Sequence, residues 1–205
     1  MLVTGTRRAV AGVAAAIATT GLVACGGGDK STSQQGGSTA PPSARAPRSW
    51  TIKGGTTRLR LNATTSKLLD AAGVRISPLG RATGGDGRFM FPVTGGKVTL
   101  DTLSGRVENA GGLRFAVAGA RIDATDLVVR PGKGVVTAIV AGKRVPLLSM
   151  EHGRVRRAPQ SGSIVIPATA ATLTPAAVPG LEDRLGNASF DGGLRLGRIQ
   201  VSAES

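Results

Sequence analysis

Alternation between apolar and polar residues, interrupted at short intervals by glycine, dominates the chain after Trp50. In residues 57–61 the leucines share one parity and the arginines the other, and Phe89, Phe91 and Val93 share one parity in residues 88–93. A strand points successive side chains to opposite faces, so each such segment can bury one face and expose the other. The pattern predicts a mainly β protein built from antiparallel strands.

Turn residues separate further alternating segments. Three hairpins are expected, with turns at residues 94–96, 110–112 and 131–134. The remaining strands are expected at residues 145–150, 163–166 and 194–201. Pro92 predicts an edge or a bulge in its strand. In the last segment the apolar parity switches at Gly197, which predicts a bulge that restores a common face.

Two segments have helical spacing instead. Residues 64–72 carry apolar side chains on one helical face and end at Gly73, which suits a left-handed cap. A second helix is expected to begin at Thr174 and Pro175, as N-cap and first helical residue. It should be short or broken, because Pro179 lies too deep for one regular helix. The expected fold is an antiparallel β-sandwich whose ends are closed by two short helices.

The first 24 residues have the parts of a bacterial signal peptide. Arg7 and Arg8 precede an apolar run over 9–23 that is too short to cross a hydrocarbon core of about 30 Å. Leu22-Val23-Ala24-Cys25 resembles the lipobox of bacterial lipoproteins. The resemblance implies cleavage between Ala24 and Cys25 and attachment of fatty acids such as palmitate to Cys25. An ordinary secreted protein with a free thiol is the alternative.

This leader predicts a lipid-anchored protein on the outer, extracytoplasmic face of a bacterial cell membrane. The export route stays open between the general and the twin-arginine pathways. Residues 25–49 are rich in Gly, Ser and Pro and predict a disordered, flexible tether. Residues 50–205 are expected to form a single domain. Because Cys25 is the only cysteine, that domain has no disulfide within the chain.

The formal net charge is +14, and it falls to +12 when Arg7 and Arg8 are removed with the leader. Nucleic acid is an unlikely partner, because the few aromatic residues occupy inward-facing strand positions and are not free to stack on bases. A solvated basic surface is the simplest interpretation, with one local cluster at Arg154, Arg156 and Arg157. Attraction to anionic lipid headgroups or wall polymers is the functional alternative. No particular protein partner or oligomeric state is indicated.

The sequence contains no recognisable catalytic constellation. Its only histidine is His152, and it lacks both the nucleophile-elbow motif and the phosphate-binding loop. The His and Cys content excludes a zinc site. Asp123 and Asp126 are too few for a calcium loop and are expected to cap a turn between strands. We therefore expect a protein that is not an enzyme and binds no metal. An envelope hydrolase remains a second alternative, and it would need two acids within catalytic reach in a cleft.

Three blocks of sequence resemble the HtaA-like domains of actinobacterial cell-surface proteins: residues 49–53, 89–96 and 105–115. The likeness extends from about Trp50 to Val140. It implies a β-rich exported fold and, as the family's role, haem uptake. The family's haem site uses a tyrosine ligand with a supporting histidine. This chain has no tyrosine, and His152 lies outside the matching blocks.

The leading hypothesis is a non-catalytic binding or structural β-domain anchored in the cell envelope, with no cofactor. The alternative is a haem or small-ligand binding surface protein of the HtaA-like type. In that alternative His152 is the candidate haem ligand, with Met150 nearby. A pocket beside Phe89 and Phe115 would be the place to look for a ligand.

Overall fold

The structure is a computed structural model that describes residues 48–158, 162–185 and 193–205. The predicted signal peptide, Cys25 and nearly all of the predicted tether lie outside the described residues. The described part is mainly β, and its strands join in one 13-stranded sheet. Neither described α-helix has the length and apolar character needed to span a membrane.

The strands, in chain order, are β1 (Ser49–Ile52), β2 (Gly54–Leu61), β3 (Arg75–Leu79), β4 (Thr83–Gly85), β5 (Arg88–Thr99), β6 (Gly105–Asn109), β7 (Gly112–Val117), β8 (Ala120–Arg130), β9 (Val135–Val140), β10 (Lys143–His152), β11 (Arg156–Ala158), β12 (Ser163–Leu173) and β13 (Arg195–Glu204). The helices are α1 (Ala63–Ala71), α2 (Val178–Leu185) and a short 3-10 helix, η1 (Pro131–Lys133).

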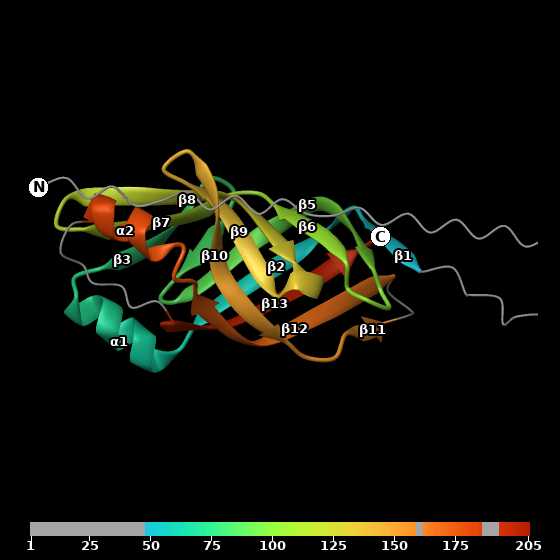
Figure 1. Ribbon diagram of the computed structural model, residues 1–205. Coiled ribbons are helices and arrows are strands. Elements are labelled where there is room, and N and C mark those ends of the chain that lie inside the picture. Colours follow the sequence, from blue (N-terminus) through green and yellow to red (C-terminus); the bar gives the residue numbers. More distant parts are fainter. Residues whose placement is uncertain (1–47, 159–161, 186–192) are drawn as a thin grey trace, which may run out of the picture. The chain divides into compact units, whose positions relative to one another are not determined.

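The sheet closes on itself and is barrel-like, so the predicted sandwich is wrong (Figure 1). The path β5-β2-β13-β12-β10-β9-β8 is completed by β6, which pairs with both β8 and β5 and so makes a ring of eight strands. The sequence pattern gives the inward parity of each strand but not its neighbours. It therefore could not distinguish two packed sheets from one closed sheet.

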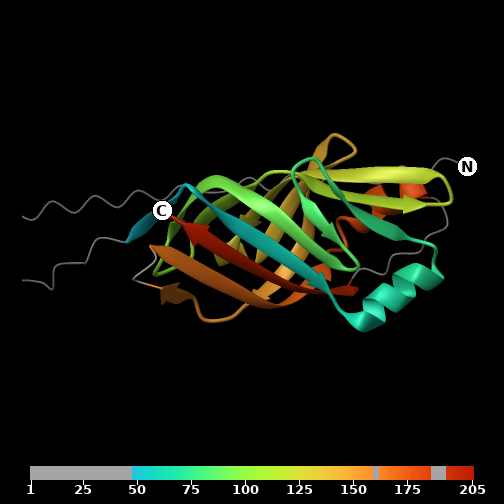
Figure 2. The same cartoon turned by 180° about the vertical axis from the view of Figure 1, so that it is seen from behind.

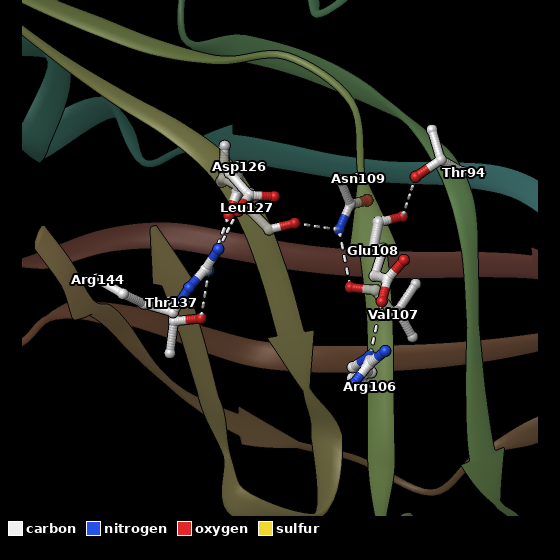
Figure 3. Close-up of polar contacts among 9 residues, drawn as sticks. All are labelled: Thr94, Arg106, Val107, Glu108, Asn109, Asp126, Leu127, Thr137 and Arg144. Atoms are coloured by element: carbon white, nitrogen blue, oxygen red, sulfur yellow. Dashed lines mark hydrogen bonds and ion pairs between the residues drawn. The ribbon is translucent and has the colours of Figure 1, made fainter. Parts of the chain in front are cut away.

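The closure at β6 and β8 is a short seam. Only Val107 and Glu108 of β6 pair with β8, opposite Val129 and Val128. Asn109 extends the contact: its Nδ2 donates to the carbonyl oxygens of Val107 and Leu127, both at 3.2 Å (Figure 3). Asn109 is only 5% exposed, so this amide holds the two strands together from inside the protein.

Two of the three predicted hairpins are wrong, and the third is confirmed. Residues 94–96 do not turn but lie within β5, with a bulge between Val93 and Gly95. A Cβ on Gly96 would lie 2.2 Å from the carbonyl oxygen of Arg106, so this glycine permits close approach of β6. The strands on either side of residues 110–112 do not pair, because β6 and β7 each pair with β8. The predicted hairpin across 131–134 is formed by β8 and β9, with η1 in the turn.

Both expected helices are present, and the second begins later than predicted. In α1, Asn62 Oδ1 accepts a hydrogen bond of 2.6 Å from the Thr65 amide, and Gly73 follows at φ +68°. Thr174 does not cap α2; its hydroxyl donates to the carbonyl oxygen of Pro146. Because α2 starts at Val178, Pro179 falls in its first turn, where a missing N–H is tolerated. Figures 1 and 2 place α1 and α2 toward the same end of the folded unit, not at opposite ends.

The predicted inward parity is confirmed. Phe89, Phe91 and Phe115 are at most 2% exposed and belong to one continuous apolar core. The predicted bulge at Gly197 is also present, since the register of β13 against β12 shifts at this residue. As a result Leu196 and Ile199 are both buried, although they differ in parity.

Candidate functional site

A row of three arginines crosses the outer face of the closed sheet. Arg60 of β2 lies directly opposite Arg88 of β5 on one side and Arg198 of β13 on the other. All three residues are exposed. Directly opposed residues on neighbouring strands have Cβ atoms about 4.5–5.5 Å apart, so three positive side chains start from adjacent positions. We refer to Arg88, Arg60 and Arg198 as the arginine row.

A second row runs parallel to the first, two residues along each strand. Here Arg58 of β2 lies between Met90 of β5 and Gln200 of β13. Met90 is 42% exposed, which is unusual for a large apolar side chain in this protein. The face therefore combines a strip of pure positive charge with a neighbouring strip of mixed polar and apolar character.

Residues of both rows line a groove with a volume of about 810 Å³, which is formed by β4, β5, β2, β13 and β12. Its lining consists of Arg58, Leu59, Arg60, Gly84, Gly85, Arg88, Phe89, Met90, Pro167, Ala168, Arg195, Arg198, Ile199 and Gln200. We call it the arginine groove. Of these described lining residues, five are arginines and none is an aspartate or a glutamate.

The charge of the arginine row is not compensated within the described part of the chain. Three arginines outside the row form ion pairs: Arg106 with Glu108, Arg114 with Asp123, and Arg144 with Asp126. Uncompensated guanidinium groups over a partly apolar floor are suited to bind anions, because the planar fork of N–H donors matches a carboxylate or a phosphate.

Gly197 allows β13 to lie close against β2 beside the arginine row. A Cβ at this position would lie 1.9 Å from the carbonyl oxygen of Arg60, so a larger residue would force the two strands apart. The glycine thus supports the register in which Arg198 lies opposite Arg60. The bulge predicted from the sequence is part of what builds the site.

A smaller hollow of about 300 Å³ lies beside Ile122, Asp123 and Gly142. Its one acid is already engaged, because Arg114 donates to Asp123 through Nε at 2.7 Å and Nη2 at 2.8 Å. Hydrogen bonding to Arg114 is the main reason why the pKa of Asp123 lies below its ordinary value. The small hollow therefore offers a ligand one positive residue, Arg121, in place of the several arginines of the larger groove.

The predicted role of the two aspartates as turn caps is wrong. Asp123 and Asp126 both lie within β8, and Asp126 forms an ion pair with Arg144 of β10 (Figure 3). Asp126 has φ +52° beside an irregularity between Thr125 and Val128, so the chain bends there without a turn between strands.

The candidate haem ligand His152 and the nearby Met150 both belong to β10. His152 ends β10, and its backbone lies opposite Ala168, which lines the arginine groove. Met150 is only 6% exposed and belongs to the core, so it is not available to a ligand. Of the two aromatic residues beside which a pocket was expected, Phe89 lines the arginine groove. Both side chains belong to the core, and Phe115 does not line the groove.

The arginine groove itself was missed by the sequence analysis, which noted only the cluster at Arg154, Arg156 and Arg157. None of these three residues lines the groove. The available signal was the shared outward parity of Arg58 and Arg60 in β2, Arg88 in β5 and Arg198 in β13. It could not be used without knowing that these strands are neighbours.

The sequence matches no protein-family model and no curated protein. The fold is similar to that of the C-terminal domain of HtaA from Corynebacterium glutamicum, at 14% identity over 75% of this chain and 97% of that chain, with a TM-score of 0.56. It is also similar to the N-terminal domain of the same protein, at 16% identity over 76% and 99%, with a TM-score of 0.50. The heme binding protein HtaB from that organism matches at 12% identity over 77% and 96%, with a TM-score of 0.48. The HtaA likenesses confirm the expected resemblance at the level of fold.

Proposed function

We propose that this chain is a non-catalytic binding protein of the bacterial cell envelope and that the arginine groove binds a small amphiphilic anion. The observation that carries the proposal is the arginine row, three directly opposed positive residues in a groove whose described lining includes no carboxylate. An anion that entered the groove would accept charge-assisted hydrogen bonds from several guanidinium groups at once.

The lining favours binding over catalysis. Its described residues include no Asp, Glu, His, Ser or Cys, and so no group that commonly acts as a nucleophile or a general acid–base. A hydrolase would need two carboxyl groups facing one cleft. Of the two hollows described above, the smaller contains one acid, and Arg114 already holds it.

Haem is the first ligand to test. It is an amphiphilic dianion whose two propionates extend from one edge of an apolar ring, which corresponds to the charged and partly apolar strips of the groove. The resemblance to the HtaA-like family, known for haem uptake at the cell surface, supports the same ligand class. Anionic lipid headgroups and wall polymers share the negative charge, and they are the competing ligands in the test below.

We further propose that the protein is held on the outer face of the membrane through acyl chains on Cys25, with residues 25–49 as the tether. The support is the coincidence of a charged amino terminus, an apolar run and a lipobox-like sequence. Two or more acyl chains give stable membrane anchoring, whereas one gives only marginal binding.

The experiment is a calorimetric titration of the purified protein with haemin, comparing wild type with the double variant R60Q/R198Q. The matched control is R154Q/R156Q, which removes the same charge from exposed arginines outside the groove. We expect saturable binding that weakens at least about tenfold in R60Q/R198Q and little in the control. Equal weakening in both variants would reveal general charge attraction, and no saturable binding of haemin would refute this ligand. Vesicles of anionic lipid, titrated in parallel, test the competing ligand.

A further inference from the structure

The arginine groove does not match the iron site that the family resemblance implies. Iron in a haem protein is held by an axial ligand such as His, Cys, Tyr or Met. The chain has no tyrosine, and among the described lining residues Met90 alone has a side chain that could bind iron. Axial methionine in cytochromes is accompanied by a histidine ligand, and the lining residues that the structure describes include no histidine.

The groove does match the acid edge of such a ligand. The arginine row offers three guanidinium groups from three adjacent strands, and all three residues line the groove. A pair of propionates is the kind of target for which this arrangement provides several bidentate contacts. The recognition elements in the structure are thus directed at carboxylates and not at a metal.

Resting on the proposed function, we propose that the arginine groove recognises a porphyrin-type dicarboxylate through its acid groups and leaves the centre of the ring uncoordinated. Metal-free protoporphyrin IX is then bound as tightly as haem. The chain would act as a carrier of tetrapyrroles that does not discriminate by their metal content.

The two rows define how such a ligand lies. The carboxylates meet the arginine row, and the ring extends over the second row, about 6.6–6.8 Å farther along the strands. There the exposed Met90 of β5 and the half-buried Pro167 of β12 provide apolar contact. Arg58 lies in the same row and can stack its planar guanidinium on the ring.

Repulsion within the row favours the same ligand. Like charges placed directly opposite each other on neighbouring strands are destabilising. A dianion bound in the groove reduces the repulsion between the arginines. The free energy recovered in this way adds to the affinity of the protein for the dianion. This contribution depends on ionic strength and does not depend on the metal.

The test compares haemin with protoporphyrin IX by the same calorimetric method on the full-length protein. Wild type, R60Q/R198Q, M90L and H152A are each titrated with both ligands. We expect dissociation constants for the two ligands within about threefold of each other in wild type. R60Q/R198Q should weaken both ligands by a similar factor of at least about ten. M90L and H152A should leave the ratio of the two constants unchanged.

The possible failures are distinguishable. If haemin binds wild type at least about tenfold more tightly than protoporphyrin IX does, the inference is overturned. The proposed function would still stand, because haemin would still bind. A change in the position of the haemin Soret band in M90L or H152A would show an axial ligand directly. If neither ligand binds, both this inference and haem as the ligand of the proposed function are refuted.

Discussion

Arg60 of β2 lies directly opposite Arg198 of β13, with no ion pair to either side chain in the described part of the chain. Paired positions of an antiparallel sheet are among the closest side-chain contacts in a protein, and two positive charges there repel each other. Local arrangements that cost stability are expected at functional sites, where a ligand compensates them. This pair is therefore the structural relationship on which the proposed site depends.

Removing one of the two charges should stabilise the ligand-free protein. We expect Arg198→Thr to raise the free energy of unfolding by about 0.2–1 kcal/mol, measured by urea denaturation at low salt. The gain should shrink at high ionic strength, because salt screens exposed charges. Arg58→Thr is the matched control, since Arg58 faces Met90 and Gln200 and not another charge. Equal effects of the two substitutions would show that threonine's strand propensity, not charge repulsion, is responsible.

The seam between β6 and β8 should depend on Asn109. Replacing Asn109 by Ala removes the donor to the buried carbonyl oxygens of Val107 and Leu127 and should cost about 1–3 kcal/mol of unfolding free energy. Thr94→Val is the control, because the Thr94 hydroxyl of β5 donates to the backbone carbonyl oxygen of Glu108 in β6 at an exposed position, and so does not bridge β6 and β8. We expect its effect to stay below about 0.5 kcal/mol. Identical urea midpoints for wild type and N109A would contradict the role given to this amide.

The ion pair between Arg114 and Asp123 should make stability depend on acid pH. Hydrogen bonding to Arg114 lowers the pKa of Asp123 in the folded state. Its contribution to stability is therefore fully present above the pKa of the unfolded chain, about 3.9, and is lost as the pH falls through the lower folded value. We expect D123N to have a lower urea midpoint than wild type at pH 7 and the difference to disappear in strong acid. A difference that stays constant down to acid pH would contradict this assignment.

The predicted anchor is tested by Cys25→Ser. The variant should be found in the soluble fraction or accumulate as an uncleaved precursor, because a serine hydroxyl cannot replace the thiol that is acylated. Membrane fractionation followed by intact-mass analysis checks both outcomes. Wild-type protein carries fatty acid at residue 25 if the proposal is right. A variant that fractionates with membranes as wild type does would show that something else attaches the protein.

Strand identity and inward parity could be predicted from the sequence because they depend on local alternation. Phe89, Phe91 and Phe115 are buried as expected, and the bulge at Gly197 follows from its switch in parity. Helix α1 was also predictable, since Asn62 and Gly73 are local cap signals.

Strand pairing could not be predicted in the same way. Gly95 and Gly96 are typical turn residues, yet they lie in the middle of β5. There Gly96 allows the backbone of β6 to approach closely. Closure into a barrel depends on pairs far apart in sequence, such as Val107 with Val129 and Arg60 with Arg198. The arginine groove is a product of that long-range pairing, so no local pattern could reveal it.

The central claim is that a ligand binds on the outer face of β2, β5 and β13. The most direct measurement is the change in backbone amide chemical shifts of isotope-labelled protein on titration with protoporphyrin IX. The account predicts saturable shifts concentrated in residues 58–60, 84–90 and 198–200. Shifts centred on the small hollow around residues 121–123 and 139–142, or no saturable shifts at all, would contradict it.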